Sequence, residues 1–236
     1  MKRSQYMKRQ AILFDLDGTL LPMDLDQFVN GYFALLAKRF SEYDPKVFLG
    51  AVWKGVRAMT DNDGSMTNEQ RFWKVFCQEV GPSALGKEEK FVNFYATDFH
   101  GAKAFTGENP LAKQMIALAR EKAEMVILAT NPMFPPCGVA SRLSWIGLQP
   151  SDFDYITTFD NSSCCKPAAA YYRGICEKFS LNPEQCLMVG NDLQEDGMGA
   201  SQIGMPVHIV TDCLISHGLE LSAWSHSTFA ELDLYL

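Results

Sequence analysis

Two aspartates, Asp15 and Asp17, stand one residue apart in the segment FDLDGTLLP, at the end of an apolar run. Residues 11–14 (AILF) have the continuous apolar character of a buried strand. Because side chains alternate along a strand, both carboxylates should leave it on the same side while Leu16 points away. Two like charges this close repel each other, most strongly in a partly dry cleft. The pair therefore indicates a bound cation, a protonated carboxyl group or a solvent-exposed turn, since Asp and Gly are also ordinary turn residues.

Further polar residues follow three later apolar runs of the chain. The run EMVILA ends on Thr130 and Asn131, and the segment CCKP places Lys166 just before a helical stretch. The run CLMVG is followed by Asn191, Asp192, Glu195 and Asp196. Each residue alone has an ordinary explanation, because Thr and Asp suit helix starts and Lys suits a solvated surface. Four consecutive strand ends would rarely all be polar by chance, so together they indicate one shared site.

The elements that must position these residues alternate between strand and helix. Apolar runs predict strands at residues 11–15, 124–130, 155–158, 186–190 and 206–210. Amphipathic stretches predict helices at residues 110–123, 135–148, 167–181 and 196–203. This alternation predicts an α/β fold, a Rossmann-like parallel sheet with helices on both faces. Ligands of such sheets bind beyond the carboxyl ends of the strands, where the polar residues fall.

A long helical segment separates the first strand from the second. Asp24, the pair Asp44-Pro45 and the capping box TNEQ at Thr67 predict the starts of three helices. Residues 87–99 predict a fourth. We expect these helices to form a small all-helical cap domain, a four-helix bundle inserted into the α/β core. The expected boundaries are residues 1–21 and 110–236 for the core and residues 22–109 for the cap.

Size and composition narrow the class of protein. The 236 residues are 47% hydrophobic and 12% aromatic, which is enough for a sizeable core. A net charge of −7 and a pI near 5.1 argue against a nucleic-acid partner, which would favour a basic face. No apolar run approaches the length of a membrane span, so no membrane partner is expected. Seven irregularly spaced cysteines suggest reduced thiols, and the cytoplasm is the expected location.

The grouped polar residues suit phosphoryl transfer. Mg²⁺ takes oxygen ligands and few protein carboxylates, so it would relieve the repulsion at Asp15 and attract a phosphate group. Lys166 and Thr130 could bind the remaining phosphate oxygens. A carboxylate could then attack phosphorus and form an aspartyl phosphate, while Asp17 could protonate the departing oxygen and later accept a proton from water.

The segments DLDGT, the Thr130 strand end, CKP and GNDLQED, in this order, resemble the four motifs of the haloacid dehalogenase superfamily of phosphohydrolases. The resemblance covers essentially the whole chain, including a helical cap between the first and second motifs. It implies that Asp15 is the nucleophile and Asp17 the general acid/base. It also implies that Thr130 and Lys166 bind the substrate phosphate, and we place the neighbouring Asn131 with them.

The resemblance further implies an Mg²⁺ site at the same strand ends. The expected ligand set is Asp15, Asp17 through its backbone carbonyl, Asn191, Asp192 and Asp196. The family often has an aspartate where this chain has Asn191, so either Asn191 or Asp192 supplies the fourth-motif ligand. Asp196 is either a further ligand or the partner of Lys166.

The expected activity is Mg²⁺-dependent hydrolysis of small phosphomonoesters through an aspartyl phosphate, with a small phosphorylated metabolite as partner. A sugar-phosphate mutase shares this chemistry and is one alternative, and a catalytically silent phospho-ligand-binding module is another. Dehalogenation is disfavoured because it needs neither an acid at position 17 nor Mg²⁺. By the same resemblance, we expect the loop at residues 60–66 to face the active site and to select the substrate. The sequence gives no indication of the oligomeric state.

Overall fold

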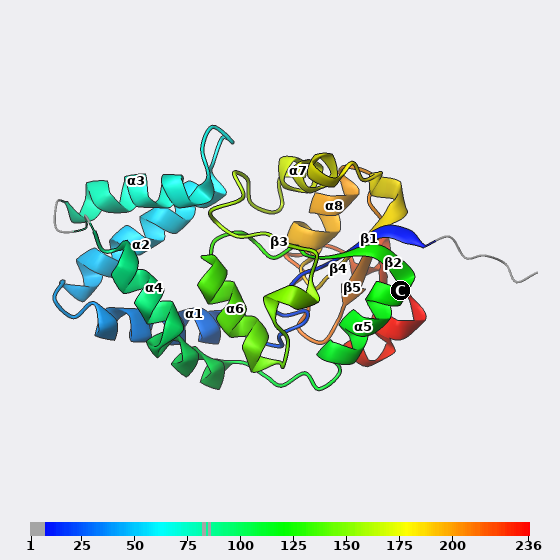
Figure 1. Ribbon diagram of the computed structural model, residues 1–236, viewed down its shortest axis with the longest axis horizontal. Helices are drawn as coiled ribbons and strands as arrows, with labels where there is room; N and C mark the ends of the chain where they lie inside the picture. Colours follow the sequence, from blue (N-terminus) through cyan, green and yellow to red (C-terminus); the bar gives the residue numbers. More distant parts are fainter. Residues whose placement is uncertain (1–7, 82–83, 85) are drawn as a thin grey trace, which may run out of the picture.

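The computed structural model describes residues 8–81, 84 and 86–236 of the chain. At its centre is a six-stranded parallel sheet in the order β3-β2-β1-β4-β5-β6 (Figure 1). The strands are β1 (Arg9–Phe14), β2 (Ala123–Leu128), β3 (Tyr155–Ile156), β4 (Cys186–Gly190), β5 (Val207–Val210) and β6 (Ser225–Ser227). The order runs outward from β1 to β3 and from β4 to β6, so its switch point lies between β1 and β4. The expected Rossmann-like parallel sheet is confirmed.

Helices cover both faces of this sheet, and strand side chains alternate between them. The covering helices are α5 (Ala112–Lys122), α6 (Pro136–Trp145), α7 (Ala169–Phe179) and α8 (Gly199–Ser201). Ala11 and Leu13 belong to the buried cluster that contains residues of α7 and α8. Ile12 and Phe14 belong to the cluster that contains residues of α5 and α6. Figure 1 shows α7 and α8 on one side of the sheet and α5 on the other. Burial on both faces explains the continuous apolar run of β1.

Between β1 and β2 the chain forms the helical insertion, our name for residues 22–109. Its elements are α1 (Leu25–Arg39), α2 (Pro45–Thr60), α3 (Asn68–Val80), α4 (Glu88–Ala96) and the 3-10 segment η2 (Asp98–Phe105). The side chains of Asp24, Asp44 and Thr67 accept hydrogen bonds from backbone N–H groups at the starts of α1, α2 and α3. The fourth helix ends earlier than the sequence predicts, because Thr97 leaves the helical dihedral angles (φ −128°, ψ −85°).

Three elements near the edges of the sheet also differ from expectation. Strand β3 is shorter than the strand expected at residues 155–158. The helix expected at residues 196–203 begins earlier, with the π-helical segment η5 (Leu193–Met198), because the Asp192 side chain caps it. Strand β6 escapes sequence prediction because its residues, Ser-His-Ser, carry no apolar alternation.

The two chain crossings between the sheet and the helical insertion lie side by side. The backbone N–H of Gly107 donates to the carbonyl of Pro22 at 2.7 Å. Met23 and Thr106 form an isolated antiparallel bridge, and the Asn109 side chain donates to the carbonyl of Leu20 at 2.8 Å. The insertion therefore leaves and rejoins the sheet through one narrow, hydrogen-bonded junction.

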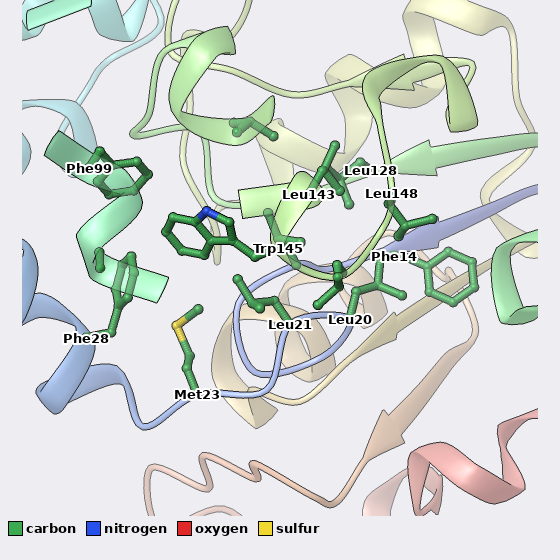
Figure 2. Close-up of a cluster of buried hydrophobic side chains, with 14 of the residues drawn as sticks. Phe14, Leu20, Leu21, Met23, Phe28, Phe99, Leu128, Leu143, Trp145 and Leu148 are labelled. Atoms are coloured by element: carbon green, nitrogen blue, oxygen red, sulfur yellow. The ribbon is translucent and has the colours of Figure 1, made fainter. Parts of the chain in front are cut away.

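Apolar packing continues through that junction (Figure 2). The ring of Trp145 on α6 lies 6.5 Å from Phe28 of α1 and 5.3 Å from Phe99 of η2, measured between centroids. On the other side, buried Asn68 at the start of α3 donates its backbone N–H to Ser162 and its side-chain amide to the carbonyl of Pro132. These contacts help to hold the insertion against the sheet domain, the name used here for residues 8–21 and 110–236.

No helix in the part of the chain that the structure describes is long and apolar enough to cross a membrane. All seven cysteines are free thiols in the structure. The fold is therefore held by apolar burial and hydrogen bonds, without disulfide cross-links.

Candidate active site

The Gly-Thr pair after the two aspartates shapes the turn at the end of β1. Gly18 has φ +90°, and a Cβ there would lie 2.3 Å from Nδ2 of Asn191. Only glycine combines this backbone conformation with so close an approach. Next to it, the Thr19 hydroxyl donates to Oδ1 of Asn191 at 2.9 Å. The first and fourth motifs are therefore joined through Asn191, across the switch point of the sheet.

Asp15, Lys166 and Asp196 form a buried charged group beneath that turn. Nζ of Lys166 lies 2.9 Å from Oδ1 of Asp15 and 2.6 Å from Oδ1 of Asp196. Burial raises the pKa of Asp15, and although Lys166 opposes this, the charges of Asp196 and Asp17 add to it. Burial alone would lower the pKa of Lys166, but Asp15 and Asp196 hold it well above its usual value. The ammonium group therefore stays charged between two carboxyl groups.

Asp196 also fixes the loop that follows β4. Its Oδ2 accepts the backbone N–H groups of Asn191 at 3.0 Å and Asp192 at 3.1 Å. A Cβ on Gly190 would lie 2.1 Å from this oxygen, so the glycine leaves room for the carboxylate. Both oxygens of Asp196 are thus bonded to the protein, and the side chain is 1% exposed.

Asp17 is paired with a residue that the sequence motifs do not reveal, Arg142 of α6. An ion pair joins Oδ2 of Asp17 to Nη1 of Arg142, whereas Oδ1 of Asp17 is buried without a partner among the described residues. The guanidinium lies 4.1 Å from the ring centroid of Phe134, and its Nε donates to the carbonyl of Gly138. The arginine is wholly buried.

A sequence signal for Arg142 does exist. Arg142 lies three residues after Val139 and next to Leu143, on the apolar side of its helix. A charged residue at a core position is expected to have a buried partner. The sequence does not say which partner, because Asp17 lies 125 residues away.

Thr130 and Asn131 lie at the end of β2, beside Lys166. The Asn131 side chain accepts from the backbone N–H of Lys166 at 3.3 Å and donates to Glu195 at 2.8 Å. Burial raises the pKa of Glu195 to about 8, with Lys166 opposing. The carbonyl of Thr130 accepts the hydroxyl of Tyr171 at 3.0 Å, which fixes the backbone at this strand end.

Asp192 has a different environment from its neighbour Asn191. One oxygen accepts the backbone N–H groups of Gln194 and Glu195, both at 2.8 Å. The other lies 2.7 Å from Nε2 of His217. This histidine is a second site neighbour that sequence reasoning misses, because no motif links residue 217 to the strand end. Asp192 thus has both oxygens engaged by the protein.

The site is the floor of a cavity of about 400 Å³ between the strand ends and the helical insertion. The sequence-predicted residues that line it are Asp15, Asp17, Thr130, Asn131, Asn191, Asp192 and Asp196. Lys166 lies behind them, bonded to Asp15 and Asp196. Of the loop at residues 60–66, only Thr60 contributes to the lining. Asn62 instead donates to the carbonyl of Met66 and to Asn68, so it holds the turn before α3.

The donor set at the floor consists of oxygen ligands, which suit Mg²⁺. The candidates are the carboxylate of Asp15, the backbone carbonyl of Asp17 and the amide oxygen of Asn191. Among the described residues, no three His, Cys, Asp or Glu side chains are arranged as a ready metal cluster.

Comparison with known proteins places the chain in a family. A family model described as haloacid dehalogenase-like hydrolase matches residues 10–204. This match covers most of the chain and all four polar strand ends, so the chain belongs to the haloacid dehalogenase-like hydrolases. The predicted family is therefore confirmed. No match was found among curated proteins.

Solved structures from this family share the fold along nearly the full chain. A predicted phosphoglycolate phosphatase from Haemophilus somnus is 20% identical, with a TM-score of 0.55 and 96% and 97% of the two chains covered. A 2-haloacid dehalogenase from Pseudomonas syringae is 17% identical, with a TM-score of 0.61 and 95% and 96% covered. CbbY from Rhodobacter sphaeroides, solved with xylulose-(1,5)bisphosphate, is 20% identical, with a TM-score of 0.57 and 95% and 96% covered. These likenesses extend to the fold alone.

Proposed function

We propose that this hydrolase is a Mg²⁺-dependent phosphatase of small phosphomonoesters that acts through an aspartyl phosphate on Asp15. The observation that carries the proposal is the position of Asp15 on the cavity floor, beside the buried ammonium of Lys166 and next to Asp17. A carboxylate nucleophile, a cation for the phosphate and a second carboxyl group for proton transfer are then within one small site.

In this proposal Asp15 attacks phosphorus with a carboxylate oxygen, and the bond between phosphorus and the alcohol oxygen breaks. The alcohol oxygen takes a proton from Asp17, which leaves Asp17 ionised. Water then attacks the aspartyl phosphate, gives a proton back to Asp17, and phosphate is released with Asp15 restored. Lys166, Thr130 and Asn131 bind the phosphoryl oxygens, and Lys166 offsets their negative charge throughout.

Asp17 is held for this exchange by Arg142. The guanidinium of Arg142 holds one carboxyl oxygen of Asp17, Oδ2, while the other, Oδ1, is buried without a partner among the described residues, and Asp17 lines the cavity. An unpaired buried oxygen is costly unless a ligand bonds to it. We propose that Oδ1 is the atom that exchanges a proton with the leaving-group oxygen, and that Arg142 is a positioning residue for it.

When bound, Mg²⁺ would neutralise developing negative charge on the phosphoryl group. Asp15, the Asp17 carbonyl and Asn191 would hold it. We favour Asn191 over Asp192, because the amide oxygen of Asn191 lies at the Gly18–Thr19 turn and keeps a second lone pair beside the bond from Thr19. Asp192, by contrast, bonds to the Gln194 and Glu195 N–H groups and to His217. We likewise propose Asp196 as the partner of Lys166 and not as a metal ligand, since both of its oxygens are bonded to the protein.

The helical insertion would act as a cap that excludes water from the floor. Its walls close the cavity above Asp15, and water exclusion strengthens electrostatic interactions there. The proposed boundaries remain residues 22–109 for this cap and residues 1–21 and 110–236 for the core.

The test is phosphate release from two esters, 4-nitrophenyl phosphate and an unactivated alkyl phosphate, with Mg²⁺ and with EDTA. We expect turnover of both with Mg²⁺ and its loss with EDTA. Release of halide from a 2-haloacid without phosphate release would instead support dehalogenation, and return of the phosphoryl group to a sugar would support a mutase. Phosphate-ester binding without any turnover would support the silent module.

A further inference from the structure

The walls of the cavity differ chemically from its floor. Apolar side chains from α1, α2, α3 and α4 form most of the lining above Asp15 and Asp17. Eight aromatic residues of the helical insertion are among the lining residues: Phe28, Tyr32, Phe33, Trp53, Phe72, Trp73, Phe91 and Tyr95. In the proposed reaction, this end of the cavity would hold the leaving group.

No positive charge faces that part of the substrate. None of the described residues that line the cavity is a lysine, arginine or histidine. The charged side chains that the insertion contributes to the lining are two carboxylates, Glu69 and Glu88. A second anionic group on the substrate would therefore meet like charge and no counter-ion.

The walls also offer few free hydrogen-bonding groups. The hydroxyls of Tyr32 and Tyr95 are 2.9 Å apart and bond to each other. The hydroxyl of Thr60 already donates to the carbonyl of Arg57 at 2.7 Å. A polyol that left water for these walls would find carboxylate acceptors at Glu69 and Glu88, but it would lose hydrogen bonds against the apolar side chains, which is costly.

We propose that the preferred substrates are monophosphates of neutral, apolar alcohols, with an aromatic or branched hydrocarbon group bound among these aromatic side chains. The proposal rests on the proposed phosphatase function and specifies its substrate class. Apolar surface moved from water into such a pocket stabilises binding, and flat rings pack well against aromatic walls. The proposal disfavours three classes of substrate. Sugar bisphosphates carry a second phosphate group, and phosphorylated carboxylic acids and 2-haloacids carry a carboxylate.

The first experiment compares kcat/KM for benzyl phosphate, glycerol phosphate, 2-phosphoglycolate, a sugar bisphosphate and choline phosphate. We expect benzyl phosphate to exceed glycerol phosphate by about 10-fold or more, because uncompensated polar groups in an apolar pocket cost at least that factor. The kcat/KM values for 2-phosphoglycolate and the sugar bisphosphate, which each carry a second anionic group, should be lower still. A preference for 2-phosphoglycolate or the bisphosphate would overturn the proposal. So would a preference for choline phosphate, which would show that Glu69 and Glu88 select a cation.

A pair of matched variants locates the preference in the cavity wall. Val92 of α4 lines the cavity and is 53% exposed, whereas Val47 of α2 is 58% exposed and does not line it. Val92→Lys and Val47→Lys make the same change of charge on an accessible surface. We expect Val92→Lys to lower the ratio of kcat/KM for benzyl phosphate to that for 2-phosphoglycolate by about fivefold or more, and Val47→Lys to leave it unchanged. Equal ratios in both variants would contradict the proposed wall.

A binding measurement separates this inference from the proposed function. If no ester is hydrolysed, including 4-nitrophenyl phosphate with Mg²⁺, the phosphatase proposal fails. The substrate preference is then read from quenching of Trp53 and Trp73 fluorescence by benzyl phosphate and by glycerol phosphate. Benzyl phosphate binding at least about 10-fold tighter supports the apolar pocket, and equal binding overturns it.

Discussion

The floor and the walls of the cavity are built from different parts of the molecule and different chemistry. The floor comes from strand ends of the sheet domain and carries Asp15, Asp17 and the buried Lys166 behind them. The walls come from the helical insertion and consist chiefly of aliphatic and aromatic side chains. The floor is suited to binding a charged phosphoryl group, and the walls are suited to selecting an apolar group by its shape. In the proposed function, the sheet domain therefore performs the reaction while the insertion selects the leaving group.

The largest effect should come from the floor. Asp15→Asn removes the proposed nucleophile, so we expect kcat to fall at least ~10³-fold on every substrate. Asp233→Asn, at an exposed position, makes the same charge change and should leave activity unaltered. Substantial turnover by Asp15→Asn, with an unchanged melting temperature, would refute the covalent route.

The next effect separates leaving groups by their need for a proton. Asp17→Asn should lower kcat for an unactivated alkyl phosphate by about 10²-fold or more, because a general acid contributes that much. The loss on 4-nitrophenyl phosphate should be smaller, since nitrophenolate departs without a proton. The measurement is kcat for both esters, with the native protein and with Asp17→Asn. Equal losses would mean that Asp17 does not supply the proton.

Arg142 should show the same pattern in weaker form. Arg142→Met removes the ion pair that holds Asp17, and we expect kcat for the alkyl ester to fall about 10-fold while KM changes little. Arg142→Lys keeps the charge and should recover part of the loss. If both esters are affected alike and Lys restores nothing, the arginine supports only the fold.

The metal requirement should distinguish two adjacent residues of the floor. We expect Asn191→Ala to raise the Mg²⁺ concentration for half-maximal activity about 10-fold. Removal of a metal ligand, or of a residue that orients one, commonly weakens metal binding by at least this factor. Asp192→Ala should raise it less, because its oxygens bond to the η5 backbone and to His217. Activity titrations with Mg²⁺ show which variant has the higher Mg²⁺ requirement. A higher requirement in Asp192→Ala would make Asp192, and not Asn191, the metal ligand.

The smallest effect concerns stability of the sheet domain in acid. His208 is buried between the hydroxyls of Ser225 and Ser227, and burial, with the charge of His226, lowers its pKa to about 4. An unfolded histidine has a pKa of about 6.5. Between these values the unfolded chain binds more protons, so the free energy of unfolding falls as pH falls.

This contribution amounts to about 1 kcal/mol between pH 7 and pH 5.5. Urea unfolding of the native protein at both pH values should show this loss in the free energy of unfolding. The loss between the two pH values should be smaller in His208→Gln. His226→Gln, on the neighbouring strand β6, removes only the smaller cause of the low pKa of His208 and should reduce the difference less. An unchanged slope in His208→Gln would mean that other groups set the acid sensitivity.

The sequence predicts the floor better than the walls for physical reasons. Asp15, Thr130, Lys166 and Asn191 each follow an apolar strand, and parallel strands bring their ends to one edge whatever the connecting segments do. The spacing DLDGT is local, so the turn at Gly18 can be read directly from the chain. The sheet and its helices follow from the same local periodicity.

The walls depend on how four helices face one another, which periodicity does not determine. Trp53, Phe72 and Trp73 have apolar spacing that fits a bundle interior as well as a cavity lining. The ion pair of Asp17 with Arg142 joins residues far apart in the chain, and only the packed helix α6 brings them together. The family resemblance implies that the loop at residues 60–66 meets the substrate, yet only Thr60 of this loop lines the cavity, and Asn62 bonds to Met66 and Asn68.

The place of the helical insertion between β1 and β2 has a consequence for the order of folding. Ala11 on the central strand β1 pairs with Met125 on β2 and with Cys186 on β4, so neither neighbour is close in sequence. Loop closure over such distances is slow, whereas α2 and α3 contact each other across a short turn. We therefore expect pulse-labelling hydrogen exchange to detect protection in α2 and α3 before β1. The first residues of the sheet domain to be synthesised would then be among the last to acquire their native partners.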